Sequence, residues 1–541
     1  MKRSVFLIFI IFISFNLFSQ NKKYIIPSSD VDKWYSRGVF YELFVRSFKD
    51  SNGDKNGDFR GVIEKIDYLK ALGISGIWFM PITDSAEKTN NYDPIDYMNV
   101  DPTYGTLDDF KELLKKCHEN GIRVIIDFVV NHTSDKHPFF IDAMKNKNSK
   151  YRNWYIWSET EPTGSWKKYW YKTETGWYYA YFINSKPDLN YKNPEVINYM
   201  KSVMKFWLDL GVDGFRFDAV TLLVENGENA IKHQPESFQI YREFRKFVEE
   251  NYKDRDIFFV AESESPYIDY LGNGKDMFHS VFDFKINNTI IRTLKDEAPI
   301  ADNGANMIES IVVKYTKDLK NKDGGFLATL LSNHDSYAGV RPFRQFEENI
   351  DKCKLAGSIY LTLPGIPFIY YGEEIGMDTT PKFKGDRFLR VPMQWDDSEN
   401  AGFTTANKAW LGVNENYKDY NVAKFEKDNN SILNHYRNLV KIRKENKSLS
   451  LGTFQTLSIV GKNNKVIGYL REFDNEKTIV ILNFDKKKYS FIKFDLTGTS
   501  LEKSDAKVTQ LLGENAKIEI KKGILSISNI ANYGTIIIKV E

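Results

Sequence analysis

The stretch LDDFKELLKKCHENGIRVIIDFVV (107–130) carries the pattern that decides the fold. Its first part, 107–121, spaces apolar side chains as one face of a helix does, and its second part, 122–130, is a short apolar run. Strands that are apolar on both faces and alternate with helices are typical of a parallel sheet covered by helices. We therefore expect a surface helix that leads directly into a buried parallel strand.

The same alternation extends over most of the chain. Seven further strand-like runs are GVFYELFV (38–45), ISGIWFM (74–80), GFRFDAV (214–220), IFFVAE (257–262), SVFDF (280–284), GFLATLL (325–331) and IPFIYY (366–371). Helix-like stretches such as FRGVIEKIDYLKALG (59–73) lie between them. Eight such strands favour a closed (β/α)8 TIM barrel. An open Rossmann-like sheet is the alternative, but no G-x-G-x-x-G motif follows the first strand.

Two segments depart from the alternation. About 80 residues separate the third strand from the fourth, and so long a connection usually carries structure or function of its own. Five of the ten tryptophans lie between Trp154 and Trp177 in this connection, and we expect a small inserted domain over 132–190. The tail, 446–541, has short alternating strand patterns separated by turn residues, which predict an antiparallel β-sandwich. The barrel is then assigned to 20–131 and 191–445.

Composition excludes several classes of protein. The 541 residues correspond to three or so domains, and an aromatic content of 15% is too high for a disordered chain. The 75 Lys+Arg nearly balance the 73 Asp+Glu, so the chain lacks the basic excess that is typical of proteins that bind nucleic acid. The two cysteines, Cys117 and Cys353, do not form a disulfide framework, and we expect buried free thiols.

The first residues resemble a secretory signal. Lys2 and Arg3 precede an apolar run from Val5 to Phe18, which is shorter than the ~20 residues needed to span a bilayer. A membrane anchor is therefore less favoured than a signal peptide over 1–19. We expect export to the periplasm or the extracellular space, and no transmembrane segment in the mature chain.

Polar side chains gather where the predicted strands end. They are Asp127, Asn131 and His132 after the third strand, Arg216 and Asp218 after the fourth, Glu262 after the fifth, and His334 and Asp335 after the seventh. TIM barrels build their active sites at this end, and desolvation makes a charged residue in an apolar strand costly unless it is paired. Four strands that end in this way indicate one shared site.

Paired carboxylates with an arginine suit cleavage of a glycosidic bond. One carboxylic acid protonates the leaving oxygen, and a second carboxylate acts on the anomeric carbon; direct attack needs the pair about 5–5.5 Å apart. Asp218 and Glu262 end adjacent strands, and Arg216 points to the same barrel face as Asp218. We expect the charge of Arg216 to keep Asp218 ionised.

With these residues in place, the sequence resembles the α-amylase family of retaining α-glucoside hydrolases and transglycosidases, closest in pattern to bacterial secreted α-amylases. The matching blocks are GVFYELFVRSF (38–48), DFVVNHTS (127–134), PDLN (187–190), GFRFDAV (214–220), VAES (260–263), LSNHD (331–335) and GIPFIYYGEEIGM (365–377). Together, in order and at barrel spacing, they cover essentially the whole mature chain.

The resemblance implies roles for individual residues. It implies Asp218 as the nucleophile, Glu262 as the acid/base and Asp335 as the stabiliser of the transition state. Arg216, His132 and His334 match positions that hold the sugar, Tyr92 matches the ring that stacks on it, and Asp127 and Asn131 match positions that support the site. A core role for His132 and ordinary packing for Tyr92 are the alternatives.

A polar loop after the first strand predicts a calcium site. Asp50, Asn52, Asp54, Asn56 and Asp58 place oxygen side chains at every second position. The loop is not an EF-hand, because Lys55 and Gly61 occupy the sixth and twelfth positions. It resembles a calcium loop of α-amylase relatives in which the Asn56 position contributes its carbonyl oxygen; a solvated turn is the alternative. The second calcium site of many α-amylases is not expected, since Thr221-Leu222-Leu223 replaces their Lys-His.

The resemblance favours an α-amylase that hydrolyses α-1,4 bonds within starch or maltooligosaccharides, as a monomer. Ala219 agrees with α-1,4 specificity, because relatives that prefer α-1,6 bonds often have Val there. Ser263 departs from typical amylases and leaves exo-acting α-glucosidase, neopullulanase-like and transglycosylating (trehalose synthase-like) activities open. A non-catalytic glucan-binding protein is a further alternative, but such relatives lose catalytic carboxylates that this chain retains.

Overall fold

The computed structural model describes residues 21–27, 31–88, 90–263, 267–295, 304–380, 382–461, 463 and 465–541. The predicted signal peptide, 1–19, lies outside the described residues. No helix within those ranges combines the length and the apolar character needed to cross a bilayer.

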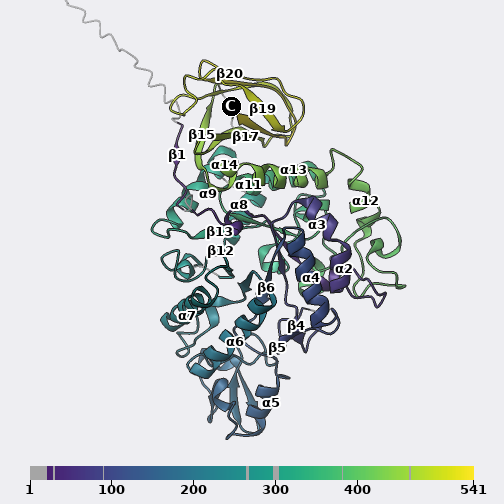
Figure 1. The fold of residues 1–541 in the computed structure, drawn as a ribbon, viewed down its shortest axis with the longest axis vertical. Helices are drawn as coiled ribbons and strands as arrows, with labels where there is room; N and C mark the ends of the chain where they lie inside the picture. The colour runs from purple at the N-terminus through teal and green to yellow at the C-terminus, as the bar shows by residue number, and fades with distance from the viewer. Residues whose placement is uncertain are drawn as a thin grey trace, which may run out of the picture.

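Eight parallel strands close into a barrel, as predicted (Figure 1). They are β2 (Phe40–Leu43), β3 (Gly76–Phe79), β6 (Arg123–Phe128), β10 (Gly214–Phe217), β11 (Phe258–Ala261), β12 (Ser280–Phe282), β13 (Phe326–Thr329) and β14 (Ile366–Tyr370). Each strand pairs in parallel with the next, and β14 returns to β2. The (β/α)8 prediction is therefore confirmed.

Helices alternate with these strands and cover the barrel. They are α1 (Trp34–Arg37), α2 (Phe59–Glu64), α3 (Ile66–Leu72), α4 (Leu107–Glu119), α6 (Pro194–Leu210), α7 (Pro235–Asn251), α8 (Phe284–Leu294), α9 (Gly304–Asp318), α10 (Pro342–Gln345), α11 (Ile350–Thr362), α12 (Val422–Phe425), α13 (Ile432–Glu445) and α14 (Lys447–Leu451). Helix α4 begins at a capping box formed by Thr106 and Asp109 and buries Phe110, Leu113 and Cys117. The apolar stripe that predicted this helix is the face that packs on the sheet.

The interior of the barrel is filled by aromatic rings. Phe40 stacks on Phe368 with 4.6 Å between ring centroids, and on Phe258 with 5.2 Å. Trp78 and Phe282 complete this layer, and all five side chains are at most 1% exposed. Because the interior is packed, polar side chains that converge on the barrel axis must do so at the C-terminal ends of the strands.

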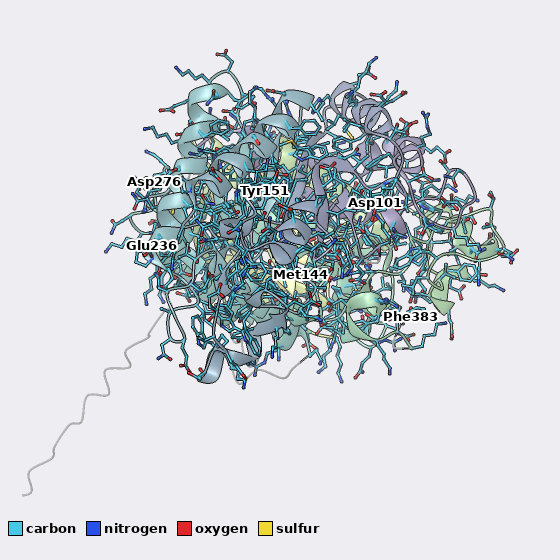
Figure 2. The ribbon with its side chains drawn as sticks, turned by 90° about the horizontal axis from the view of Figure 1, so that it is seen from below. Asp101, Met144, Tyr151, Glu236, Asp276 and Phe383 are labelled. Carbon is cyan, nitrogen blue, oxygen red and sulfur yellow. The ribbon has the colours of Figure 1, made fainter. Side chains whose placement is uncertain are left out.

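Two short antiparallel elements lie in the connections near that end. β4 (Thr83–Ser85) pairs with β5 (Pro94–Val100) between β3 and β6. The long connection after β6 holds α5 (Pro138–Lys145) and a three-stranded sheet of β7 (Trp157–Ser158), β9 (Gly176–Tyr179) and β8 (Trp170–Thr173). Figure 2 shows Met144 and Tyr151 of this insert between Glu236 of α7 and the segment around Phe383.

The chain ends in a nine-stranded antiparallel sheet at the opposite end of the molecule from the insert (Figure 1). Its strands are β15 (Thr453–Ile459), β16 (Val466–Phe473), β17 (Glu476–Asn483), β18 (Tyr489–Asp495), β19 (Val508–Leu512), β20 (Ile518–Lys521), β21 (Ile524–Ile530), β22 (Thr535–Val540) and, from the start of the chain, β1 (Lys23–Tyr24). Ile481 of β17 and Ile527 of β21, from different parts of the sheet, share one core, so the strands form a sandwich. β1 pairs with β15 and so lies on this sandwich rather than on the barrel.

Candidate active site

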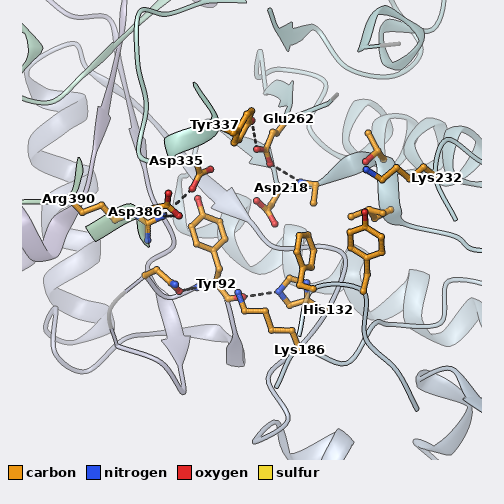
Figure 3. A pocket seen from close by; sticks show the side chains of 16 residues that line it. Tyr92, His132, Lys186, Asp218, Lys232, Glu262, Asp335, Tyr337, Asp386 and Arg390 are labelled. Atoms are coloured by element: carbon orange, nitrogen blue, oxygen red, sulfur yellow. Dashed lines mark hydrogen bonds and ion pairs between the residues drawn. The ribbon is translucent and has the colours of Figure 1, made fainter. Parts of the chain in front are cut away.

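The predicted site residues converge on one cavity of about 390 Å³ at the C-terminal ends of the strands (Figure 3). Those that line it are Tyr92, His132, Asp218, Glu262 and Asp335. Arg216 and His334 are fully buried behind this lining. Arg216 contacts the carboxylate of Asp218, and His334 contacts that of Asp335. The structure thus brings together all seven predicted catalytic and substrate-binding residues.

Arg216 joins three carboxylates. Its Nη1 atom lies 2.7 Å from Oδ1 of Asp218 and 3.0 Å from the carboxylate of Asp127, and its Nη2 atom lies 2.8 Å from Oε2 of Glu262. Residues 216 and 218 do share one face of the barrel end, as the period of a strand requires. The two carboxylates proposed to react therefore flank one guanidinium group.

The pKa of Asp218 reflects two opposing effects. Burial raises its pKa well above the ordinary aspartate value; Arg216 opposes that rise, whereas Glu262 and Asp127 add to it. We predicted that the charge of Arg216 would keep Asp218 ionised. Arg216 does favour the ionised form, as predicted, but one guanidinium shared among three carboxylates offsets the effect of burial only in part.

The backbone after Asp218 adopts an unusual conformation. Ala219 has a φ of 45°, in the left-handed region that a residue with a Cβ rarely occupies. In this conformation the N–H of Ala219 donates to Oε2 of Glu262 over 3.0 Å. The Oε1 atom of Glu262 accepts a hydrogen bond from the hydroxyl of Tyr337 over 2.7 Å. Both oxygens of this carboxylate are therefore held by named donors.

Asp335 is held in its ionised form. Its Oδ2 lies 3.1 Å from Nε2 of His334, and its Oδ1 lies 3.1 Å from Nη2 of Arg390. Burial opposes ionisation, but these two cations outweigh it and lower the pKa of Asp335. Burial also lowers the pKa of His334, but Asp335 and Glu42 outweigh that effect and raise it to about 10. A charged imidazole thus stands behind Asp335 at neutral pH.

Tyr92 and His132 form the floor of the cavity. The Tyr92 ring stacks on His334 with 5.4 Å between centroids, and its hydroxyl donates to Oδ2 of Asp127 over 2.8 Å. His132 is hydrogen-bonded through Nε2 to the carbonyl of Tyr92, and burial lowers its pKa to about 3, so its ring is neutral. Both side chains are buried, yet both also border the cavity.

Several residues of the site escaped the sequence analysis. Glu42 accepts a hydrogen bond from His334 behind the cavity. Its sequence context could have indicated this role, because Glu42 is a charged residue inside the apolar run GVFYELFV. The cavity is also lined by Arg390 and Lys186 from loops and by Tyr337 from a short 3-10 helix, and none of these segments has a periodic pattern. No local signal marks these three side chains.

The predicted calcium loop folds as a tight turn of oxygen-bearing side chains. Asp50 and Asp58 are buried, and Asp50 accepts hydrogen bonds from the N–H groups of Asn52 and Gly53. The Asn56 side chain turns away and accepts from Arg46, which leaves its carbonyl as the available oxygen. Among the residues described, no cluster of three or more acidic, histidine or cysteine side chains could hold a metal. A cation here would therefore need amide and carbonyl oxygens as well, which is the donor chemistry that calcium accepts.

Asn131 links the insert to the barrel. Its Nδ2 atom donates to Oδ2 of Asp188 over 3.1 Å and to the carbonyl of Leu222 over 2.7 Å. Burial raises the pKa of Asp188 to about 8. The amide of Asn131 thus bridges the PDLN segment and the loop after β10, in agreement with the supporting position that the resemblance implied.

Comparison with known proteins agrees with this geometry. The family model described as "Alpha amylase, catalytic domain" matches residues 42–452. Alpha-amylase 3 of Dictyoglomus thermophilum is 36% identical over 514 residues, which cover 94% of each chain. An oligo-1,6-glucosidase of Parageobacillus thermoglucosidasius is 33% identical and covers 84% of this chain and 91% of its own.

A solved structure shares the whole architecture. The crystal structure of the α-amylase from H. orenii is 34% identical, with a TM-score of 0.78, and the match covers 93% of this chain and 99% of that chain. These similarities extend through the barrel, the insert and the C-terminal sandwich.

Proposed function

Because the chain belongs to the α-amylase family of glycoside hydrolases, we propose that it hydrolyses α-1,4-glucosidic bonds within starch and maltooligosaccharides. The observation that carries this proposal is the pair Asp218 and Glu262, held on either side of Arg216 in a cavity that Asp335 also lines. Two neighbouring carboxylates suit a double displacement that retains configuration.

In the first step, Glu262 gives its proton to the glycosidic oxygen while Asp218 attacks the anomeric carbon. The bond to the leaving chain breaks, and a covalent glycosyl-enzyme forms on Asp218. In the second step, Glu262 removes a proton from water, and the water oxygen displaces Asp218 from the anomeric carbon. Asp335, kept ionised by His334 and Arg390, is placed to bind hydroxyls of the sugar as its ring flattens.

A second candidate is an exo-acting or transglycosylating enzyme. The ion pair between Arg390 and Asp386, 3.5 Å apart, lies beside Asp335 and narrows that end of the cavity (Figure 3). The opposite end is bordered by Thr221 and Lys232 and lies on the side of the loop after β10. A cavity narrowed at one end favours release of short units from a chain end, and one relative is named an oligo-1,6-glucosidase.

Products from five substrates distinguish these activities. We expect the purified enzyme to release a mixture of short oligosaccharides from soluble starch and maltotriose, and to leave pullulan, isomaltose and trehalose largely intact. Chromatography of early time points is the measurement. Glucose as the sole early product of starch would instead support the exo-acting enzyme, and formation of trehalose or isomaltose would support transglycosylation. Isomaltose cleavage faster than maltotriose cleavage would contradict the α-1,4 proposal.

We further propose that the loop 50–58 binds calcium. The ligands would be the side chains of Asp50, Asn52, Asp54 and Asp58 and the carbonyl oxygen of Asn56. Calcium takes six to eight oxygen ligands and would join the loop after β2 to the segment around Thr404, whose hydroxyl bonds Asp50. Its role here would be structural, because these residues lie outside the set that lines the catalytic cavity.

Chelation is expected to destabilise the protein. A ligand that binds only the folded state raises its stability by mass action, so excess EDTA should lower the melting temperature by several degrees and added calcium should restore it. An Asp54→Ala variant should melt like the chelated wild type and no longer respond to EDTA. A wild-type melting curve that EDTA does not move would contradict the calcium proposal.

We also propose that the chain is exported to the periplasm or the extracellular space. The support is the pattern of residues 1–19, in which two cations precede an apolar run too short to span a bilayer. The chemistry of the substrate agrees, because a large glucan reaches an exported enzyme without transport.

A further inference from the structure

The hydroxyl of Tyr337 lies against the acid/base carboxylate, a contact that the proposed mechanism does not use. Tyr337 follows Asp335 by two residues, in the short 3-10 helix Ser336–Ala338, and its hydroxyl donates to Oε1 of Glu262 over 2.7 Å (Figure 3). The residue is 55% exposed, so its ring borders the mouth of the cavity while its hydroxyl reaches Glu262.

The other oxygen of Glu262 cannot carry the proton that catalysis transfers. Oε2 accepts from the N–H of Ala219 and lies 2.8 Å from Nη2 of Arg216. A backbone N–H and a guanidinium are donors only, so a proton on Oε2 would lose the hydrogen bond from Ala219 and would face the positive charge of Arg216. The transferable proton of Glu262 must therefore reside on Oε1, the oxygen that Tyr337 contacts.

A hydroxyl can donate to this oxygen or accept from it through the same oxygen atom, without moving the side chain. The double displacement needs Glu262 protonated in the first step and ionised in the second. We propose, on the basis of the proposed function, that Tyr337 is a positioning residue for Glu262 in both steps. Its hydroxyl donates to Oε1 when Glu262 is ionised and accepts from Oε1 when Glu262 is protonated, so the carboxyl group keeps its orientation as its proton leaves and returns.

Tyr337 is itself held in place as a neutral phenol. Its ring packs edge-on against Phe284 with 4.8 Å between centroids, and the amide of Asn287 donates to the carbonyl of Ala338 beside it. Both partners belong to α8, which is part of the rigid barrel. Burial of the hydroxyl, together with Glu262 and Asp335, raises the pKa of Tyr337, so the phenol keeps its proton at all working pH values.

The test distinguishes a specific loss of proton transfer by Glu262 from a nonspecific loss of activity through a disturbed structure. Tyr337→Phe removes only the hydroxyl, and we expect kcat/KM on maltotriose to fall roughly ten-fold, as for loss of a hydrogen bond to a charged group. With α-glucosyl fluoride, whose leaving group needs little protonation, kcat/KM should fall less than three-fold. In a Glu262→Gln background, Tyr337→Phe should cause no further loss on maltotriose, because its effect passes through Glu262.

Tyr489→Phe is the matched control, since that hydroxyl also donates to a carboxylate, Asp485, but in the C-terminal sandwich. Equal losses on both substrates, or losses that add to those of Glu262→Gln, would overturn the assignment of Tyr337. Unchanged activity of Tyr337→Phe on both substrates would overturn it as well. Failure of the proposed function looks different, because it appears in the wild-type enzyme itself, as isomaltose cleavage faster than maltotriose cleavage or as no cleavage of maltotriose.

Discussion

Asp218→Asn is expected to lower kcat on maltooligosaccharides by roughly four to six orders of magnitude, the range seen when a covalent nucleophile is removed. The amide has almost the shape of the carboxylate but cannot form a stable glycosyl ester. Loss should be equally severe with α-glucosyl fluoride, because an activated leaving group does not replace a nucleophile. Initial rates on both substrates are the measurement.

Folding should survive this change. The raised pKa of Asp218 means that burial disfavours its ionised form, so at neutral pH the ionised carboxylate makes the folded state less stable. Replacing it with a neutral amide should leave the melting temperature unchanged or higher, as is common where function and stability compete. Asp108→Asn, on the exposed surface of α4, is the matched control and should keep wild-type activity. Wild-type rates for Asp218→Asn would contradict the assignment and favour a non-catalytic glucan-binding protein.

The strands of the barrel could be predicted because each is apolar on both faces, a pattern that few other structures produce. Their ends were less well defined: the run 38–45 contains only four strand residues, Phe40–Leu43, because its flanks turn into loops. The helix-like stretch 59–73 forms two helices, α2 and α3, interrupted at Lys65 with φ −106° and ψ 11°. The ammonium group of Lys65 lies 4.3 Å from the ring centre of Trp395, a tertiary contact that no local pattern reveals.

Residues of the site likewise divide into those that a local sequence pattern reveals and those that depend on tertiary contacts. Asp218, Glu262 and Arg216 could be identified from the sequence, because desolvation makes a charged residue at the end of an apolar strand costly unless it is paired. Arg390 and Tyr337 come from irregular segments, where the neighbours of a side chain depend on how distant loops meet. The effect of Arg216 on the pKa of Asp218 could be predicted, but the net rise could not, because the sequence showed one adjacent cation and not how many carboxylates share it.

Glu262→Gln is expected to have the second largest effect, and its pattern across substrates identifies its role. The neutral amide cannot give a proton to the leaving oxygen, so kcat/KM on maltotriose should fall by about 10²–10⁴-fold, the usual contribution of a general acid. With α-glucosyl fluoride the first step should remain fast, since fluoride leaves with little protonation. Glu236→Gln, on the exposed surface of α7, is the matched control.

The second step then becomes the slow one, because no carboxylate remains to take a proton from water. A covalent glycosyl-enzyme should accumulate with α-glucosyl fluoride and be visible by mass spectrometry as an adduct of one glucosyl unit. Azide is an anion and attacks without a general base, so it should restore turnover and yield a glycosyl azide of retained configuration. In Asp218→Asn, azide can react only by direct attack on the anomeric carbon, so any glycosyl azide from this variant should have inverted configuration. Retained configuration in the azide products of both variants, or no rescue of Glu262→Gln, would contradict the assignment of the two carboxylates, because one group bonds to the sugar and the other moves the proton.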